Sequence, residues 1–167
     1  MDILIRRARP AEYETLGDIT AQAYLQDGLL TFGENDWYLG ELKDVAKRAA
    51  AADVLVAIQG DRLLGGVTFV PSPGPMADLA RAGEAEIRML AVAQAARGRG
   101  AGEALVRACV DRARSAERTG MVLSTQDLMH AAHRIYERLG FTRAPERDWH
   151  PIPEHPEFTL LTYQLTL

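Results

Sequence analysis

Apolar residues in the first 50 positions recur at intervals that predict one short strand and then two helices. Two isoleucines alternate with other residues over 3–7, which is typical of a strand. Pro10 suits the first turn of a helix, and apolar residues follow it at helical spacing as far as Tyr24. A second helix is expected over 35–50, where one side consists of Tyr38, Leu42, Val45, Ala46 and Ala49.

The middle of the chain has the pattern of strands and turns. An apolar run over 54–58 and another over 63–70 flank a Gly-Asp turn at 60–61, which predicts a β-hairpin. Residues 71–83 include three prolines within five positions, so we expect an exposed loop there. Strand character returns over 84–92.

The rest of the chain alternates helical and strand patterns. We expect a helix ending near 117, a strand over 121–125, a helix over 129–139 that Gly140 ends, and strands over 141–144 and 158–167. A proline-rich connection joins the last two strands. This order of elements predicts an α/β (α+β mixed) fold, with helices packed against a mixed sheet in a single domain over 1–167.

Composition narrows the classes of function. The chain has 167 residues and a formal net charge of −4, which gives no support for a nucleic-acid partner. The single cysteine, Cys109, rules out an internal disulfide and points to a reducing compartment. Apolar runs fall short of the ~20 residues that span a bilayer, and the N-terminus lacks the charge order of a signal peptide. We therefore expect a cytoplasmic protein without a membrane partner.

A glycine-rich turn between the strand at 84–92 and the following helix carries the candidate chemistry. It reads Arg97-Gly98-Arg99-Gly100-Ala101-Gly102. Free backbone N–H groups at a helix N-terminus bind anions, and glycine lets phosphate oxygens approach the backbone closely. The glycine spacing does not match G-x-G-x-x-G, and no Gly-Lys-Ser/Thr follows, so neither a dinucleotide fold nor a P-loop is indicated. A phosphate-binding module of another kind stays open.

The turn and two further segments resemble the GNAT superfamily of N-acetyltransferases. The family's pyrophosphate motif, Gln/Arg-x-x-Gly-x-Gly/Ala, is matched by Arg97, Gly100 and Gly102. Residues 86–92 resemble its central strand, and residues 132–141 resemble its Ala-x-x-x-Tyr-Glu-x-x-Gly-Phe segment. Many members have Asn where this chain has Met129, so one polar contact to coenzyme A is missing from the match.

The resemblance implies a GNAT-like central mixed, mostly antiparallel sheet flanked by about four helices. It implies acetyl-CoA or coenzyme A as co-substrate, with no metal. The strands at 84–92 and 121–125 would splay apart, and the pantetheine arm would pair with the first of them. The residues implied in cofactor binding are Leu90, Ala91, Val92, Arg97, Gly98, Arg99, Gly100, Ala101 and Gly102.

The implied reaction is direct attack of a primary amine on the acetyl thioester. Tyr136 matches the family's tyrosine that faces the sulfur and would protonate the leaving thiolate. Glu86 is the best candidate for the base, because it lies on the central strand on the same face as Glu84. Tyr136 could instead serve packing alone, and Glu86 could be a strand residue paired with Arg88.

Other functions stay open beside this one. A non-catalytic coenzyme-A-binding or regulatory module is the alternative. His130 and His133 lie one turn apart, but the sequence positions no further zinc ligand, and Cys109 falls in an apolar stripe. The acceptor is a small-molecule or peptide amine, and Glu34, Asp36 and Asp127 are acids that would favour a cationic one. A homodimer through the apolar strand at 158–167 is possible by analogy with the family.

Overall fold

The computed structural model describes residues 2–167, and its centre is a seven-stranded sheet with the order β1-β2-β3-β4-β5-β7-β6. Strands β4 and β5 are parallel, and the other neighbours are antiparallel. This confirms the expected mixed, mostly antiparallel sheet. The strands are β1 (Leu4–Arg7), β2 (Asp53–Gln59), β3 (Arg62–Val70), β4 (Glu84–Val92), β5 (Gly120–Thr125), β6 (Thr142–Arg143) and β7 (Leu161–Thr166).

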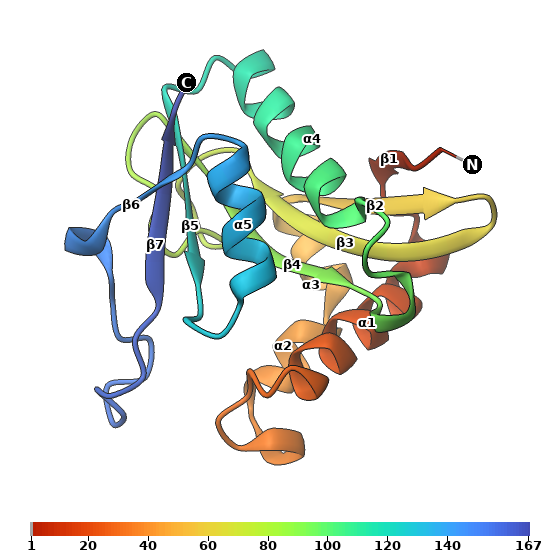
Figure 1. Cartoon of the computed structure of the whole chain (residues 1–167), viewed down its shortest axis with the longest axis horizontal. Coiled ribbons are helices and arrows are strands. Elements are labelled where there is room, and N and C mark those ends of the chain that lie inside the picture. The colour runs from red at the N-terminus through yellow and green to blue at the C-terminus, as the bar shows by residue number, and fades with distance from the viewer. Residues whose placement is uncertain (1) are drawn as a thin grey trace.

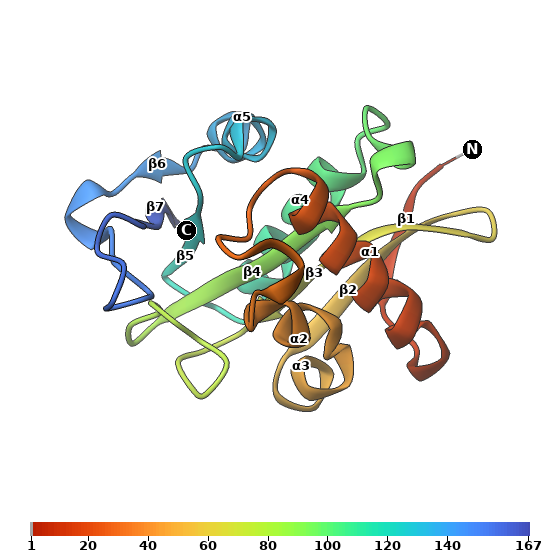
Figure 2. The ribbon, with the colours of Figure 1, turned by 90° about the horizontal axis from the view of Figure 1, so that it is seen from below.

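Helices cover both faces of this sheet (Figures 1 and 2). One face carries α1 (Tyr13–Gln26), α2 (Tyr38–Lys43) and α3 (Val45–Ala51), and the other carries α4 (Ala101–Ser115) and α5 (His130–Arg138). Helix α4 connects the parallel strands β4 and β5, as a crossover of this kind requires. Its N-terminus therefore lies next to the end of β4.

The expected single helix over 35–50 is two helices. Asp44 has non-helical backbone angles (φ −85°, ψ 69°), and its side chain accepts a hydrogen bond from the Lys47 N–H. An aspartate in this position caps a new helix, because its oxygen satisfies one of the free N–H groups of the first turn. The described residues thus form five α-helices instead of about four.

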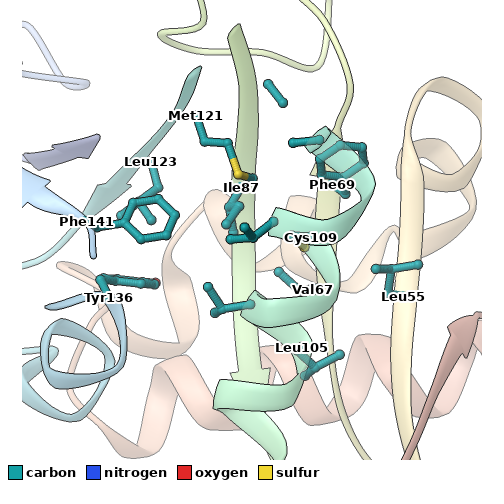
Figure 3. Close-up of a cluster of buried hydrophobic side chains, with 14 of the residues drawn as sticks. Leu55, Val67, Phe69, Ile87, Leu105, Cys109, Met121, Leu123, Tyr136 and Phe141 are labelled. Carbon is teal, nitrogen blue, oxygen red and sulfur yellow. The ribbon is translucent and has the colours of Figure 1, made fainter. Parts of the chain in front are cut away.

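The main core lies between the sheet and α4 and α5 (Figure 3). Leu105 and Cys109 of α4 pack over Ile87 of β4 and Met121 of β5. Cys109 is fully buried, as its place in an apolar stripe predicted, and burial raises the pKa of its thiol. A smaller cluster on the opposite face consists of Leu16, Val45, Val54 and Val56.

The C-terminal strand is an interior strand. It pairs with β5 along 161–166 on one edge and with β6 at Tyr163 and Gln164 on the other. The homodimer stays a prediction. Within residues 2–167, no helix combines the length and the hydropathy needed to cross a bilayer.

Candidate active site

The glycine-rich turn presents a group of free backbone donors at the start of α4. Gly98 and Gly100 adopt positive φ values of 81° and 86°, which residues with a side chain rarely adopt. Among residues 2–167, no acceptor takes a hydrogen bond from the backbone N–H groups of 98–103. A Cβ added at Gly98 or Gly100 would meet no protein atom within 4 Å. The turn is therefore open to an anion.

The arginines of the turn are held by neighbouring elements. The Arg97 guanidinium donates to both carboxylate oxygens of Asp27, at 3.0 and 2.8 Å, and Asp27 directly follows α1. Arg99 donates to the Gln59 side-chain oxygen at 3.0 Å. Both contacts are exposed, so they hold positive charge beside the turn without burying it.

The remaining glycine of the turn has a packing role. A Cβ on Gly102 would lie 3.0 Å from the Ile135 Cδ1 atom, so glycine permits α4 and α5 to approach closely. Gly102 thereby holds α5, which carries Tyr136, against the first turn of α4.

Strands β4 and β5 separate, as the resemblance to the GNAT superfamily implied. Their pairing ends at Ile87 and Leu123, which leaves residues 88–92 without a partner on β5. Met89 has a φ of 55°, and the register of β4 against β3 shifts at this point. Leu90 packs on the same core as Ile87, although three positions separate them, so this irregularity switches the alternation of the strand.

A cavity of about 420 Å³ adjoins the splayed strands. Arg88 and Met89 of β4 and Ser124 and Thr125 of β5 contribute to its wall. Most of the remaining wall comes from α1, α2 and the two segments 29–38 and 149–160, with further residues from β4, from Asp78 and from Gln126 and Met129. The cavity therefore lies where an acyl group carried between β4 and β5 would meet its acceptor.

Three contacts hold the two covering segments in place. Gln126 donates to the Leu29 carbonyl at 2.8 Å, and Trp149 donates to the Ser124 hydroxyl at 3.0 Å. The rings of Phe32 and His155 lie 5.6 Å apart in an edge-on arrangement. The sequence could not identify this enclosure, because each contact joins residues far apart in the chain.

Tyr136 lies on the other side of the sheet, in the main core (Figure 3). It is 3% exposed, and its ring centre lies 5.9 Å from that of Phe141 and 5.7 Å from that of Tyr163. Burial raises its pKa, so the phenol keeps its proton at neutral pH. A raised pKa also makes the phenol a weaker acid towards a thiolate, and the ring contacts fit the packing role. Its role stays a prediction.

Glu86 is completely buried, and its carboxylate already accepts hydrogen bonds. Its oxygens accept hydrogen bonds from the backbone N–H groups of Asp78, Leu79 and Ala80, at 2.7–3.1 Å. Burial raises the pKa of this carboxyl, and the three N–H donors oppose that rise. Glu86 lines the cavity, but these bonds favour a role in anchoring residues 78–80 over proton transfer. The base assignment stays a prediction.

The same loop is held by two arginines that the sequence did not single out for this role. Arg88 donates to the Met76 carbonyl at 2.9 Å and pairs with Asp78 at 3.2 Å, instead of pairing with Glu86. Arg147 donates to the Leu79 carbonyl at 3.1 Å and holds both oxygens of Glu84 at 2.8 Å. Its two contacts on Glu84 lower the pKa of that carboxyl.

Met129 and His133 occupy the start of α5. Met129 lines the cavity, and its sulfur accepts a hydrogen bond from the Thr125 hydroxyl at 3.5 Å. The His133 Nε2 atom lies 3.2 Å from that hydroxyl and 2.9 Å from the Gln126 carbonyl. Burial lowers the pKa of His133. His130 adjoins it, but residues 2–167 contain no group of three or more side chains able to hold a metal.

The sequence also matches a known protein family. The model of the acetyltransferase (GNAT) family matches residues 14–141. The chain belongs to the GNAT acetyltransferase family. No curated protein matches the sequence.

Solved structures of GNAT proteins share the fold. Ribosomal-protein-alanine N-acetyltransferase from Brucella melitensis has 21% identity and a TM-score of 0.73, covering 98% of this chain and 99% of its own. The yncA protein from Salmonella typhimurium, solved with its cofactor acetyl-CoA, has 22% identity and a TM-score of 0.74, covering 99% and 94%. A GNAT acetyltransferase from Brucella melitensis in complex with acetyl-CoA has 28% identity and a TM-score of 0.61, covering 84% and 83%.

The residues present here fit acetyl-CoA, which is bound in two of these GNAT structures. The free N–H groups of 98–103 and the two arginines suit its pyrophosphate. The part of β4 that has no β5 partner offers backbone groups to the pantetheine amides.

Proposed function

We propose that the protein transfers an acetyl group from acetyl-CoA to a primary amine held in the 420 Å³ cavity. One observation carries this proposal. The separated end of β4 lies next to the glycine-rich turn, and the separated ends of β4 and β5 also form part of the cavity wall. Membership of the GNAT acetyltransferase family supports the transfer of an acetyl group.

Bound acetyl-CoA supplies a thioester whose carbonyl carbon is open to attack by a neutral amine. The amine nitrogen bonds to this carbon, the carbon–sulfur bond breaks, and the sulfur leaves as a thiolate. The Tyr136 phenol gives its proton to that thiolate, and the excess proton on the nitrogen replaces it on the phenolate.

Under this proposal, each predicted site residue has one task. The turn at 97–102 binds the pyrophosphate, and Leu90, Ala91 and Val92 align the pantetheine arm. Glu86 acts as a positioning residue that fixes the loop at 78–80 beside the acceptor. An amine near pKa ~8 needs no dedicated base, because about a tenth of it is neutral at pH 7. An alkylamine near pKa ~10 is neutral to only about one part in 10³ and would gain from a base, for which Glu86 stays the predicted candidate.

The test begins with cofactor binding. Gly100→Val should abolish binding of acetyl-CoA, since valine disfavours the positive φ of this position and covers the free N–H groups. Folding should be largely kept, because the added atoms meet no protein atom within 4 Å of the Cβ. Calorimetry gives the affinity of each variant.

Gly33→Val is the matched control. Gly33 also has a positive φ and open space around its Cβ position, but it lies outside the turn. We expect it to bind acetyl-CoA like the wild type. Undiminished binding by Gly100→Val would refute the cofactor site. If acetyl-CoA binds but no amine causes the release of coenzyme A, the alternative function, a non-catalytic coenzyme-A-binding module, is supported instead.

A further inference from the structure

The cavity has an unusually aromatic wall. Both tryptophans of the chain, Trp37 and Trp149, line it, together with Tyr24, Tyr38 and Phe158. The ring centres of Trp37 and Tyr38 are 5.4 Å apart, and those of Tyr24 and Tyr38 are 6.5 Å apart. The end of α1 and the start of α2 thus present three adjoining rings to a ligand.

The charged side chains of the wall are mostly acidic. Four acids, Asp36, Glu41, Asp78 and Glu86, contribute to the wall, beside one guanidinium, that of Arg88. Asp36 and Glu86 accept backbone hydrogen bonds and keep no cationic partner from the wall, whereas Glu41 pairs with Lys47. Arg88 is already engaged, because it pairs with Asp78, donates to the Met76 carbonyl and donates to the Tyr38 hydroxyl at 3.3 Å. Such a wall attracts a cation and offers a carboxylate no free partner. Of the three acids noted in the sequence, the structure brings Asp36 into this wall.

The size of the cavity suits a small molecule. Its 420 Å³ lies within the usual range for small-ligand sites, roughly 300–1,000 Å³. The contacts from Gln126 to Leu29 and from Phe32 to His155 cover it with two segments of the chain itself.

We propose that the acceptor is an arylalkylamine, a primary amine joined by a short chain to an aromatic ring, without a carboxylate. This inference rests on the proposed acetyl transfer. The ring would stack among Tyr24, Trp37 and Tyr38, which prefer edge-on or offset contact with a further ring. The acids and the aromatic faces draw in the protonated amine, and its small neutral fraction then reacts.

Three matched acceptors test this substrate class. 2-Phenylethylamine has the ring and the amine, phenylalanine adds a carboxylate, and 1,4-diaminobutane has the charge without the ring. With the full-length protein and acetyl-CoA, we expect kcat/KM for 2-phenylethylamine to exceed that for each of the others by at least about tenfold.

Trp37→Ala tests the aromatic wall itself. Trp37 is 64% exposed, so its loss should spare the fold while raising KM for 2-phenylethylamine about tenfold. Leu128→Ala is the matched control, because Leu128 is 61% exposed and lies outside the cavity wall. Its KM should equal that of the wild type.

Asp78→Asn tests the acidic surplus. The Asp78 side chain pairs with Arg88, whereas its backbone N–H holds Glu86, so the substitution should leave the loop anchored. Freed from its carboxylate partner, Arg88 should improve the use of phenylalanine relative to 2-phenylethylamine about tenfold. An unchanged ratio contradicts the charge argument.

The two proposals fail in distinguishable ways. If the wild type prefers phenylalanine or 1,4-diaminobutane, the arylalkylamine inference is wrong and the acetyl transfer stands. If acetyl-CoA binds but none of the three acceptors releases coenzyme A, the arylalkylamine inference is wrong. The acetyl transfer itself is refuted when no amine of a wider panel releases coenzyme A.

Discussion

Tyr136 illustrates how burial sets the chemistry of one residue. Its ring contacts Phe141 and Tyr163 in the main core, and burial raises the pKa of its hydroxyl. If the hydroxyl protonates the leaving thiolate, Tyr136→Phe should lower kcat about 10²-fold. The affinity for acetyl-CoA should hardly change, because phenylalanine keeps the ring. Steady-state kinetics and calorimetry on the same variant separate the two quantities.

Tyr163→Phe is the control for this prediction. Tyr163 adjoins Tyr136 in the same cluster, but its hydroxyl donates to the Glu137 carboxylate at 3.1 Å. Removing that hydroxyl should leave kcat near the wild-type value. If Tyr136→Phe keeps the wild-type kcat, Tyr136 serves packing alone.

At the residue scale, the sequence was most informative where the function depends on the backbone. Gly98 and Gly100 adopt the conformations that favour glycine, so the residue type itself points to the turn. The environment of Glu86 could not be predicted in this way, because its three hydrogen-bond donors come from a loop with no recognisable motif. Its place on the strand could be predicted, but its hydrogen bonds could not.

Among the elements, the loop at 71–83 shows why a buried charge is tolerated on β4. The Glu86 carboxylate satisfies three backbone N–H groups, while Arg88 and Arg147 satisfy two carbonyls of the same loop. Loops without regular structure need such partners when their backbone is covered. The side chains of β4 and the C-terminal region thereby fix one side of the acceptor cavity.

Glu86→Gln should loosen this loop. Glutamine has one acceptor oxygen, and its amide would face N–H donors, so we expect a loss of about 2 kcal/mol in the free energy of unfolding. We also expect a higher KM for the acceptor. Denaturant unfolding and the pH dependence of kcat/KM measure both effects.

The pH dependence distinguishes an anchor from a base. An anchoring role predicts that Glu86→Gln keeps the acidic limb of kcat/KM, whereas loss of that limb would assign Glu86 as the base. Burial raises the folded-state pKa of this carboxyl, so its contribution to stability is largest at low pH and declines as pH rises through that value. The glutamine variant should lack this decline.

The elements themselves were mostly predictable, and the one clear error has a local cause. The helix expected over 35–50 is divided because Asp44 caps α3, and an aspartate ahead of an apolar turn is a recognised start signal. By contrast, β6 has only two residues, and its pairing with β7 is set by the sheet and not by its own sequence.

At the scale of the whole molecule, the cofactor turn and the acceptor cavity share a connection through Asp27. This residue follows α1, holds Arg97 of the turn, and stands two positions before Leu29 of the cavity wall. No sequence pattern links Asp27 to Arg97, because 70 positions separate them. Trp37 and Trp149 likewise meet in one cavity only through the fold.

This connection leads to a prediction about cofactor affinity. The Asp27 and Arg97 side chains are 37% and 40% exposed, and an exposed ion pair contributes little stability, about 0–1 kcal/mol. The phosphates of coenzyme A would compete with Asp27 for the guanidinium and would be repelled by its charge. Asp27→Asn keeps the shape of the side chain and removes that charge. We therefore expect the Kd for coenzyme A to fall about threefold.

Ionic strength and a distant acid provide the controls. The decrease in Kd caused by Asp27→Asn should become smaller as the salt concentration rises, since the Debye length falls from about 10 Å at 0.1 M to about 3 Å at 1 M. Asp111→Asn should leave Kd unchanged, because Asp111 lies eleven positions beyond Gly100 on α4, a rise of about 16 Å. Calorimetry at two salt concentrations gives each value. A Kd that rises in Asp27→Asn would mean that Asp27 holds Arg97 in its binding position. The ion pair would then favour cofactor binding instead of opposing it.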